Sequence, residues 1–287
     1  MKQIPVRQIT ASQKTSAPAE RFTIRTVESI LGGNDLQHDL HRHAFFFVLL
    51  IQHGDGVHEI DFTPYPVYDS SVFFLRPGQV HQLLLKGNST GYLMEFNNEF
   101  YHPTDKAASQ RLRKASSKNY CKLEEASFVR LQTILAQVFR EYTNQESGYT
   151  DIIKASLEIF FIEFVRQSTN PNSASTNAGS YTQDRFEEFL ACLDINIITD
   201  KQVSQYTNRM NLSTYQLNEI TKAAVGKTPS ELINDQIILE AKRYLLATPN
   251  QVKDIADHLG YEDVSYFIRF FKKHTGFSPE AFRHNHS

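Results

Sequence analysis

Three histidines in the first third of the sequence have the types and spacing of a metal site. One residue separates His41 from His43, and on a β-strand this spacing places both imidazoles on one face. His81 follows on a later predicted strand. The apolar run after His43 contains no carboxylate, and we expect Glu59 and Asp61 on another strand. We therefore predict that the histidines form hydrogen bonds inside their domain, and we assign no metal ligand and no cofactor.

A second group of residues, near the end of the chain, has the chemistry of a DNA contact. Arg269, Lys272 and Lys273 fall within one predicted helix, together with Ser265 and Tyr266. An arginine guanidinium can bind guanine through two hydrogen bonds in the major groove, and lysines neutralise phosphates. An earlier helix offers a similar outward set, which comprises Thr214, Tyr215, Asn218 and Lys222. The two sets predict that double-stranded DNA is a partner.

The elements that would position the histidines are β-strands. From about residue 21 to residue 100, short apolar runs are separated by Gly, Pro, Asn and Asp at roughly ten-residue spacing, which is typical of a barrel or sandwich. No helical period is expected in this region. The predicted strands are 44–53, 57–62, 72–75, 81–86 and 91–96.

Two amphipathic helices follow the β region. Apolar residues recur at three- and four-residue steps from Phe128 through Leu135 and Val138, and a second helix carries a wide aromatic face that includes Phe160 and Phe161. Packing on the β region would use part of this surface. Because two such faces offer more apolar surface than one small barrel needs, we also expect them to form a homodimer.

Composition marks the boundaries of the domains. Residues 168–180 (STNPNSASTNAGS) contain no large apolar residue and no charge, which predicts a flexible linker. We expect residues 1–20 to be a flexible N-terminus without a signal peptide, and residues 21–167 to form the first domain. No run of apolar residues has the length of about 18 residues that a membrane-spanning helix needs. The two cysteines match no metal or redox spacing, as expected for a cytoplasmic protein.

A weak internal duplication organises residues 181–287, which predict an all-α domain. The tetrapeptide GKTP at 226–229 recurs fifty residues later as GFSP at 276–279. Each copy predicts a short helix, a turn and a second helix that ends at Gly and Pro. The two helix-turn-helix units are expected at about 201–224 and 252–274, and a linker helix at about 230–247 joins them.

The second copy has a detailed local pattern. Gly260 allows the left-handed turn between its helices, and Asp263 is a candidate cap for the second helix. Phe267, Phe270 and Phe271 are expected to face inward, which leaves the basic residues outside. In the first copy, Ser213 is the candidate cap.

Residues 201–283 resemble the AraC-type DNA-binding domain, which has two helix-turn-helix motifs and a linker helix. The resemblance is strongest from Ile255 to Arg283, which reads IADHLGYEDVSYFIRFFKKHTGFSPEAFR. The first copy departs from the family at Glu219, where Arg is frequent, and at Thr221, where a buried Phe is frequent. The resemblance implies a transcription factor. It also implies that activation, through contact with RNA polymerase, is a more frequent role than repression.

The segment from His41 through RPGQVH (76–81) to about Phe96 resembles the cupin-like effector domain of many AraC-type regulators. It implies a jelly-roll barrel with a pocket for a small-molecule effector. Candidate lining residues are His43, Phe45, Phe47 and Tyr92. The fold class is thus α+β, with a cupin-like β barrel and dimerisation helices before an all-α double helix-turn-helix domain.

The charge balance and the motifs leave two alternatives open. The chain has a net charge of −2, and residues 181–287 hold 12 Lys and Arg against 14 Asp and Glu, so we expect dimerisation to supply part of the DNA affinity. One alternative is a metal-dependent cupin enzyme with a helical tail. It is disfavoured because the acid ligand of metal-binding cupins is missing after His43, and we find no nucleophile elbow, phosphate loop or paired carboxylates of an enzyme. The other is a regulator whose barrel binds a protein instead of a small ligand.

Overall fold

Contacts within the chain divide it into two units, Pro5–Ser173 and Ala174–Ser287, and Met1–Ile4 group with the second. The structure is a computed structural model and describes residues 3–7, 9, 21–103, 105–168 and 177–286. Most of the predicted linker, 168–180, therefore lies outside the described residues.

The first sheet explains why the run at 44–53 is apolar at nearly every position. Phe46, Val48 and Leu50 on its central strand face a cluster that includes helices, whereas Phe47 and Leu49 face the barrel interior. Because side chains alternate along a strand, burial of both faces requires a continuous apolar run. In spatial order the sheet contains β10 (Tyr120–Lys122), β7 (Ser71–Leu75), β4 (Phe46–His53), β9 (Thr90–Phe96) and β2 (Phe22–Thr26).

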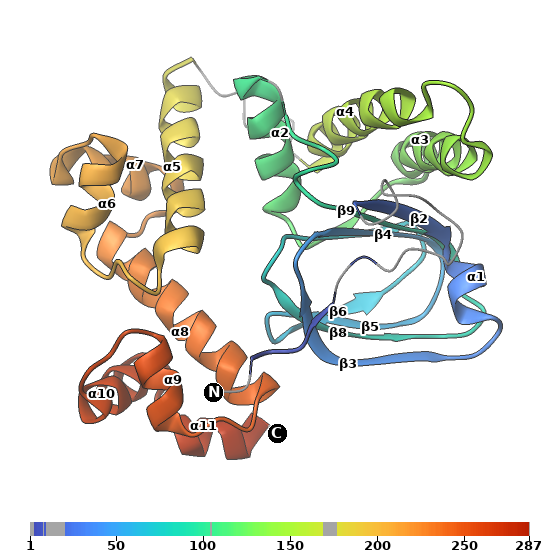
Figure 1. Ribbon diagram of the computed structural model, residues 1–287. Helices are drawn as coiled ribbons and strands as arrows, with labels where there is room; N and C mark the ends of the chain where they lie inside the picture. Colours follow the sequence, from blue (N-terminus) through green and yellow to red (C-terminus); the bar gives the residue numbers. More distant parts are fainter. Residues whose placement is uncertain (1–2, 8, 10–20, 104, 169–176, 287) are drawn as a thin grey trace. The chain divides into compact units, whose positions relative to one another are not determined.

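The second sheet lies opposite the first and closes the predicted β sandwich (Figure 1). In spatial order it contains β1 (Val6–Arg7), β3 (Leu36–His43), β8 (Val80–Leu85), β5 (Gly56–Ile60) and β6 (Thr63–Val67). Pro64 and Pro66 fall within β6, which is an edge strand, where a missing backbone donor is tolerated. The pairing of β1 with β3 also gives structure to part of the N-terminus that we expected to be flexible.

One helix in the β region was missed. α1 (Val27–Leu31) follows β2 directly, although no helix was predicted between residues 21 and 100. Thr26 caps its start by accepting a hydrogen bond from the Ser29 amide, and Gly32 ends it at φ 54°. A helix of five residues is too short to show a 3.6-residue period.

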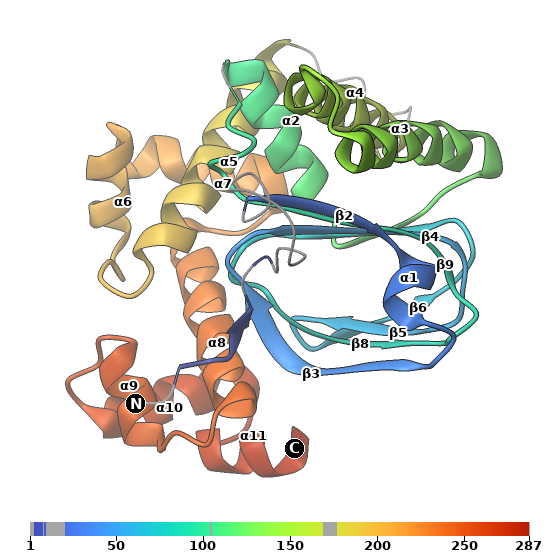
Figure 2. The same ribbon diagram turned by 45° about the vertical axis from the view of Figure 1, so that its right-hand side comes forward.

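Three further helices cover the outer face of the first sheet (Figure 2). They are α2 (Lys106–Ser116), α3 (Glu125–Asn144) and α4 (Tyr149–Ser168). Leu135, Val138, Phe160 and Phe161 are fully buried, and the Phe161 ring stacks on Phe74 of β7 with centroids 5.9 Å apart. The expectation that these apolar residues were surplus and available to a dimer was wrong, because the sheet and the three helices bury them within one chain.

The second unit is entirely helical in its described residues. A long helix, α8, joins two smaller helical groups at its ends (Figure 1). The helices are α5 (Asn177–Asn196), α6 (Val203–Met210), α7 (Thr214–Val225), α8 (Pro229–Ala247), α9 (Val252–His258), α10 (Val264–Thr275) and α11 (Pro279–His286). α5 was expected to begin near Asp184, and it begins inside the predicted linker. None of the described helices has the length and apolar character needed to cross a bilayer.

The duplicated tetrapeptide serves the same structural purpose in both copies. Gly226 and Gly276 end α7 and α10 in the left-handed conformation, at φ 72° and 81°. Thr228 then caps α8 by accepting a hydrogen bond from the Glu231 amide, and Ser278 accepts one from the Ala281 amide in α11. The following prolines occupy the first helical turn, where no backbone donor is needed.

Candidate DNA-binding helices and barrel cavity

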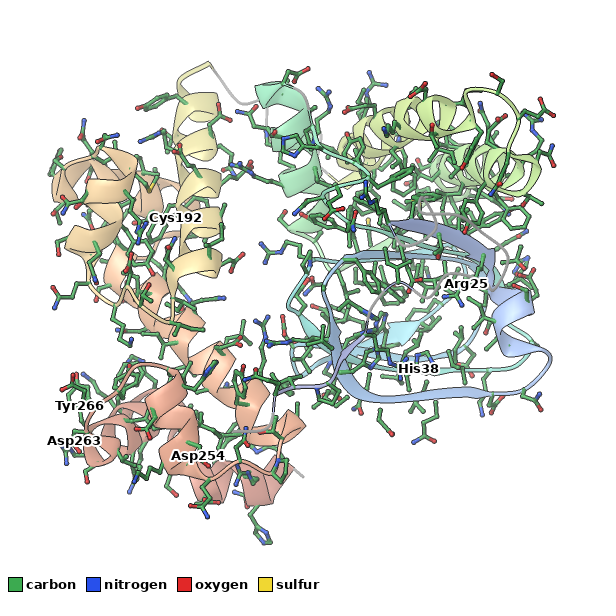
Figure 3. The ribbon with its side chains drawn as sticks, viewed as in Figure 1. Arg25, His38, Cys192, Asp254, Asp263 and Tyr266 are labelled. Atoms are coloured by element: carbon green, nitrogen blue, oxygen red, sulfur yellow. The ribbon has the colours of Figure 1, made fainter. Side chains whose placement is uncertain are left out.

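The outward face of α10 carries the basic residues found in the sequence. Asp263 caps this helix by accepting a hydrogen bond from the Ser265 amide at 2.7 Å, and Gly260 has the predicted left-handed φ of 73°. Figure 3 shows Asp263 and Tyr266 together at one end of α10. The five candidate contacts on this helix are all exposed, namely Ser265, Tyr266, Arg269, Lys272 and Lys273.

Phe270 differs from its two neighbours on α10. Phe267 and Phe271 are fully buried as expected, but Phe270 is only half-buried, so its predicted inward position was wrong. Residues 267 and 271 are four apart and share one helix face, whereas residue 270 lies at the edge of that face. There Phe270 lies beside His274, with ring centroids 4.6 Å apart. It also lines a groove between α10 and the start of α8 that includes Ser230, Asn234, Tyr266, Arg269 and Lys273.

α7 presents a smaller and less basic face than α10. Ser213 caps it, and Gln216 completes a reciprocal capping box with the Ser213 amide. Its four candidate DNA contacts are Thr214, Tyr215 and Lys222, which are exposed, and Asn218, which is half-buried. Thr221 is fully buried, and its hydroxyl donates a hydrogen bond to the Asn218 carbonyl. A small, hydrogen-bonded side chain is thus buried at the position where the resemblance has a frequent Phe.

The barrel contains a cavity of about 200 Å³ between its two sheets. Three of the four predicted effector contacts line it, namely His43, Phe45 and Phe47. Tyr92 does not line it, because alternation along β9 turns this ring toward α3, where its centroid lies 5.8 Å from that of Phe139. Leu93 and Glu95 of β9 face the cavity instead.

Charged groups stand at one side of this largely apolar cavity. Arg7, Arg25, His38 and Glu95 all line it, and Figure 3 shows Arg25 and His38 on the two facing sheets. The Arg25 guanidinium lies 3.2 Å from the Glu95 carboxylate, which also accepts a hydrogen bond from Thr23. Burial raises the pKa of Glu95, and the Arg25 charge opposes this shift. Burial, assisted by the Arg7 charge, lowers the pKa of His38 to about 4, so its imidazole is neutral at pH 7.

A chain of buried histidines runs across three neighbouring strands of the second sheet, β3, β8 and β5, and begins at His43 in the cavity wall. The Nε2 atoms of His43 and His81 lie 2.7 Å apart, and His81 Nδ1 lies 2.8 Å from His58 Nε2. The expected hydrogen bonding among barrel histidines is therefore present, with His58 as a member that the sequence did not identify. Burial lowers the pKa values of both His43 and His58 to about 3, so both rings are neutral at pH 7.

Two family models match this chain, one in each unit. Residues 30–159 match an AraC-like ligand binding domain, and residues 206–285 match a helix-turn-helix domain. The chain belongs to the AraC-type family of transcriptional regulators.

Relatives and solved structures resemble this AraC-type regulator along most of its length. The HTH-type transcriptional activator RhaS of Escherichia coli O157:H7 (strain EC4115 / EHEC) is 23% identical over 255 residues, which cover 85% of this chain and 86% of RhaS. RhaS of Klebsiella pneumoniae (strain 342) is 25% identical over 254 residues, with the same coverage. The crystal structure of unsaturated fatty acid bound ToxT from Vibrio cholerae is 16% identical, covers 92% of this chain and 95% of ToxT, and has a TM-score of 0.41.

The sequence alone did not identify the charged cavity residues of this regulator. Arg7 and Arg25 lie near the N-terminus, His38 and Glu95 on two later strands, and the register of the sheets brings them together. One signal was present in the sequence. Glu95 is two residues after Leu93 and so shares its strand face, which marks it as a charge pointing into an apolar interior.

The Asp263 cap gives a direct test of the α10 geometry. Asp263→Ala removes the acceptor of the Ser265 amide and is expected to lower the free energy of unfolding of the second unit by about 1 kcal/mol. Urea denaturation of the full-length regulator measures this change. Glu262→Ala is the matched control, because Glu262 is the exposed acidic neighbour outside the cap, and its effect should stay within about 0.5 kcal/mol. Equal effects of the two changes would contradict the capping role.

Proposed function

We propose that this regulator binds double-stranded DNA through α7 and α10 and activates transcription in response to a small molecule held in the barrel cavity. The observation that carries the DNA part is the exposed basic face of α10, opposite the fully buried side chains of Phe267 and Phe271. A helix of this kind fits the major groove of B-DNA. Arg269 is the base-reading residue, and Lys272 and Lys273 bind phosphates.

We infer that α7 mainly places polar side chains against the DNA and supplies little positive charge. Thr214 and Tyr215 lie at its exposed start, and Tyr215 is 73% exposed, which is typical of a side chain that meets a partner. Asn218 and Lys222 continue the same face, and exposed Glu219 limits the number of phosphates that this helix can approach. We infer that α10 carries most of the sequence preference.

We also propose that the protein activates transcription, forms a homodimer and is located in the cytoplasm. The RhaS relatives are named transcriptional activators, and we propose the same role for this regulator, with RNA polymerase as a partner. The second unit is slightly acidic, so pairing of two chains on adjacent half-sites would supply affinity that bulk charge does not. Ile152 and Ile159 lie two turns apart on α4 and remain 39% and 53% exposed, which supports this helix as part of a dimer interface.

The cavity favours an organic anion with an apolar body. Leucine and phenylalanine side chains form most of its wall, and Arg7 and Arg25 together outnumber the single carboxylate of Glu95. A carboxylate on the ligand would complete the charge balance beside the arginines, because guanidinium groups bind carboxylates through paired hydrogen bonds. Its volume of about 200 Å³ limits the ligand to a small metabolite.

A thermal-shift screen of the full-length regulator tests this ligand class. Small apolar carboxylic acids should raise the melting temperature, whereas their neutral amides should not. Arg25→Gln should abolish the shift because it removes a guanidinium from the cavity. Arg21→Gln is the control, since Arg21 is paired with Glu99 and does not line the cavity. Equal stabilisation by acids and amides would contradict the proposed charge recognition.

The same screen separates the two alternative roles of the barrel. If no small molecule stabilises the protein, the barrel is better explained as a protein-interaction module. We infer a regulator and not a cupin enzyme, because the related proteins are transcriptional regulators.

Genome-wide mapping of the full-length protein on DNA tests the proposal as a whole. We expect a limited set of sites that share a repeated motif and lie upstream of transcribed genes. Uniform occupancy without a motif would overturn it. The genes next to the sites would indicate the chemical class of the effector.

A further inference from the structure

We propose that His41, His43 and His81 form a binding site for one divalent transition-metal ion inside the barrel, and that His58 orients His81. This site shares His43 with the wall of the cavity, but its binding of a metal does not depend on the proposed DNA or effector functions. It revises the sequence-based expectation that the chain has no metal ligand.

The three imidazoles converge on a common point from two neighbouring strands. Their ring centroids lie 4.4 to 4.8 Å apart in all three pairings. One candidate ligand nitrogen from each ring lies within 4.8 Å of the other two, and all three residues are buried. The arrangement follows from sheet register, since His41 lies directly opposite His81 in the pairing of β3 with β8, and His43 is two residues further along β3.

In His41 and His81, the Nδ1 atom is hydrogen-bonded and points away from the common point. This leaves the Nε2 atom of each ring free to bind a metal. His41 Nδ1 lies 2.6 Å from the Asp39 carbonyl oxygen, so it carries the proton and donates, which leaves a lone pair on Nε2. His81 Nδ1 can donate in the same way to His58 Nε2. Metal-binding histidines in proteins are usually fixed by a hydrogen bond of this kind from the other ring nitrogen.

Without a metal, hydrogen bonds do not give every ring nitrogen of the cluster a partner. A proton can lie between the Nε2 atoms of His43 and His81, which are 2.7 Å apart. His41 Nε2, however, is buried and has no hydrogen-bond partner among the residues that the structure describes. An ion at the common point would accept the lone pairs of all three rings. With metal–nitrogen bonds of about 2.0–2.1 Å in tetrahedral geometry, it would separate the ligand atoms to about 3.3 Å.

The donor set defines the class of metal. Three neutral imidazoles suit Zn²⁺, Co²⁺, Ni²⁺ and Cu²⁺, whereas Mg²⁺ and Ca²⁺ prefer oxygen ligands. A carboxylate ligand is unnecessary, because three histidines alone form known zinc sites. The pairing of β5 with β8 brings His58 within hydrogen-bond distance of His81.

Metal binding by the untagged, full-length protein is the test. The protein is stripped with a chelator and dialysed against Zn²⁺ or Co²⁺, and bound metal is then counted by mass spectrometry. We expect one ion per chain and, with Co²⁺, visible absorption bands typical of nitrogen ligands. His81→Gln should lower the affinity at least 100-fold, and His58→Gln about 10-fold, as for other residues that orient a metal ligand.

A matched variant distinguishes the buried site from surface histidines. His53→Gln removes an exposed histidine that is paired with Asp69 in the same domain, and it should leave metal binding unchanged. Circular dichroism confirms that each variant is folded. If His81→Gln does not fold, His41→Gln replaces it, since the His41 imidazole is hydrogen-bonded to the Asp39 carbonyl on its own strand. Wild-type protein that binds less than one ion in ten chains, or a folded His81→Gln or His41→Gln that binds as tightly as wild type, would overturn the proposal.

Discussion

Arg269→Ala is expected to weaken binding of the regulator to its own operator by about 1–3 kcal/mol, which is roughly 5- to 150-fold, and to change binding to random DNA little. The Arg269 side chain is 68% exposed on α10, and its ion pair with Asp263 is long, at 3.8 Å. Such exposed pairs contribute little stability, so the guanidinium is available to guanine. Titration of labelled operator and random duplexes measures both affinities.

Lys273→Ala is the matched control for Arg269→Ala. Lys273 is exposed on the same helix and is assigned to a phosphate. Its loss should weaken binding to both DNAs equally and reduce the slope of log affinity against log salt by about 0.9. If Arg269→Ala behaves in the same way as Lys273→Ala, Arg269 is a phosphate contact and the base-reading role is wrong.

Leu135→Glu and Val138→Glu are each expected to unfold the first unit. Both side chains are fully buried between α3 and the neighbouring elements, so a glutamate there would be an uncompensated buried charge. The loss of stability should exceed about 4 kcal/mol, which is a large part of the stability of a typical domain. Urea denaturation and the yield of soluble protein measure this effect.

The same variants separate core packing from dimer contacts. Val129→Glu is the control, because Val129 lies on α3 and is 49% exposed, and its effect on stability should stay within about 0.5 kcal/mol. A stably folded monomer of Leu135→Glu, detected by light scattering, would show that these residues hold two chains together and do not form the core.

The second unit was largely predictable because its signals are local. Caps at Ser213 and Asp263, the left-handed Gly260 and the repeated tetrapeptides all act within a few residues of chain. The long helix at 229–247 and both helix-turn-helix units therefore lie close to the predicted ranges. Phe270 was misplaced because a residue at the edge of a helix face is buried or exposed according to what packs beside it.

The first unit shows the limits of local signals. Apolar runs and turn residues located β4, β5, β7, β8 and β9, but β1, β2, β3, β6 and β10 were not among the predicted strands. The strand partners were not found either, because strand pairing joins segments far apart in the chain. Tyr92 was assigned to the wrong face for this reason, and Arg25 was not connected to Glu95. The apolar face of α4 was recognised and was expected to pack in part on the β region, but nothing in its sequence showed that the sheet and the neighbouring helices bury Phe160 and Phe161 completely.

By itself, the sequence determined the AraC-type organisation, the exposed basic residues of α10 and the aromatic interior of the barrel. These depend on periodicity and on short motifs, which are properties of neighbouring residues. Only the tertiary structure decided which charged side chains line the cavity. It also showed that His58 contacts His81 through a ring nitrogen, and that His81 contacts His43 in the same way. The physical reason is sheet register, because a shift of one residue in the pairing of β5, β8 and β3 would turn each of these imidazoles to the opposite face.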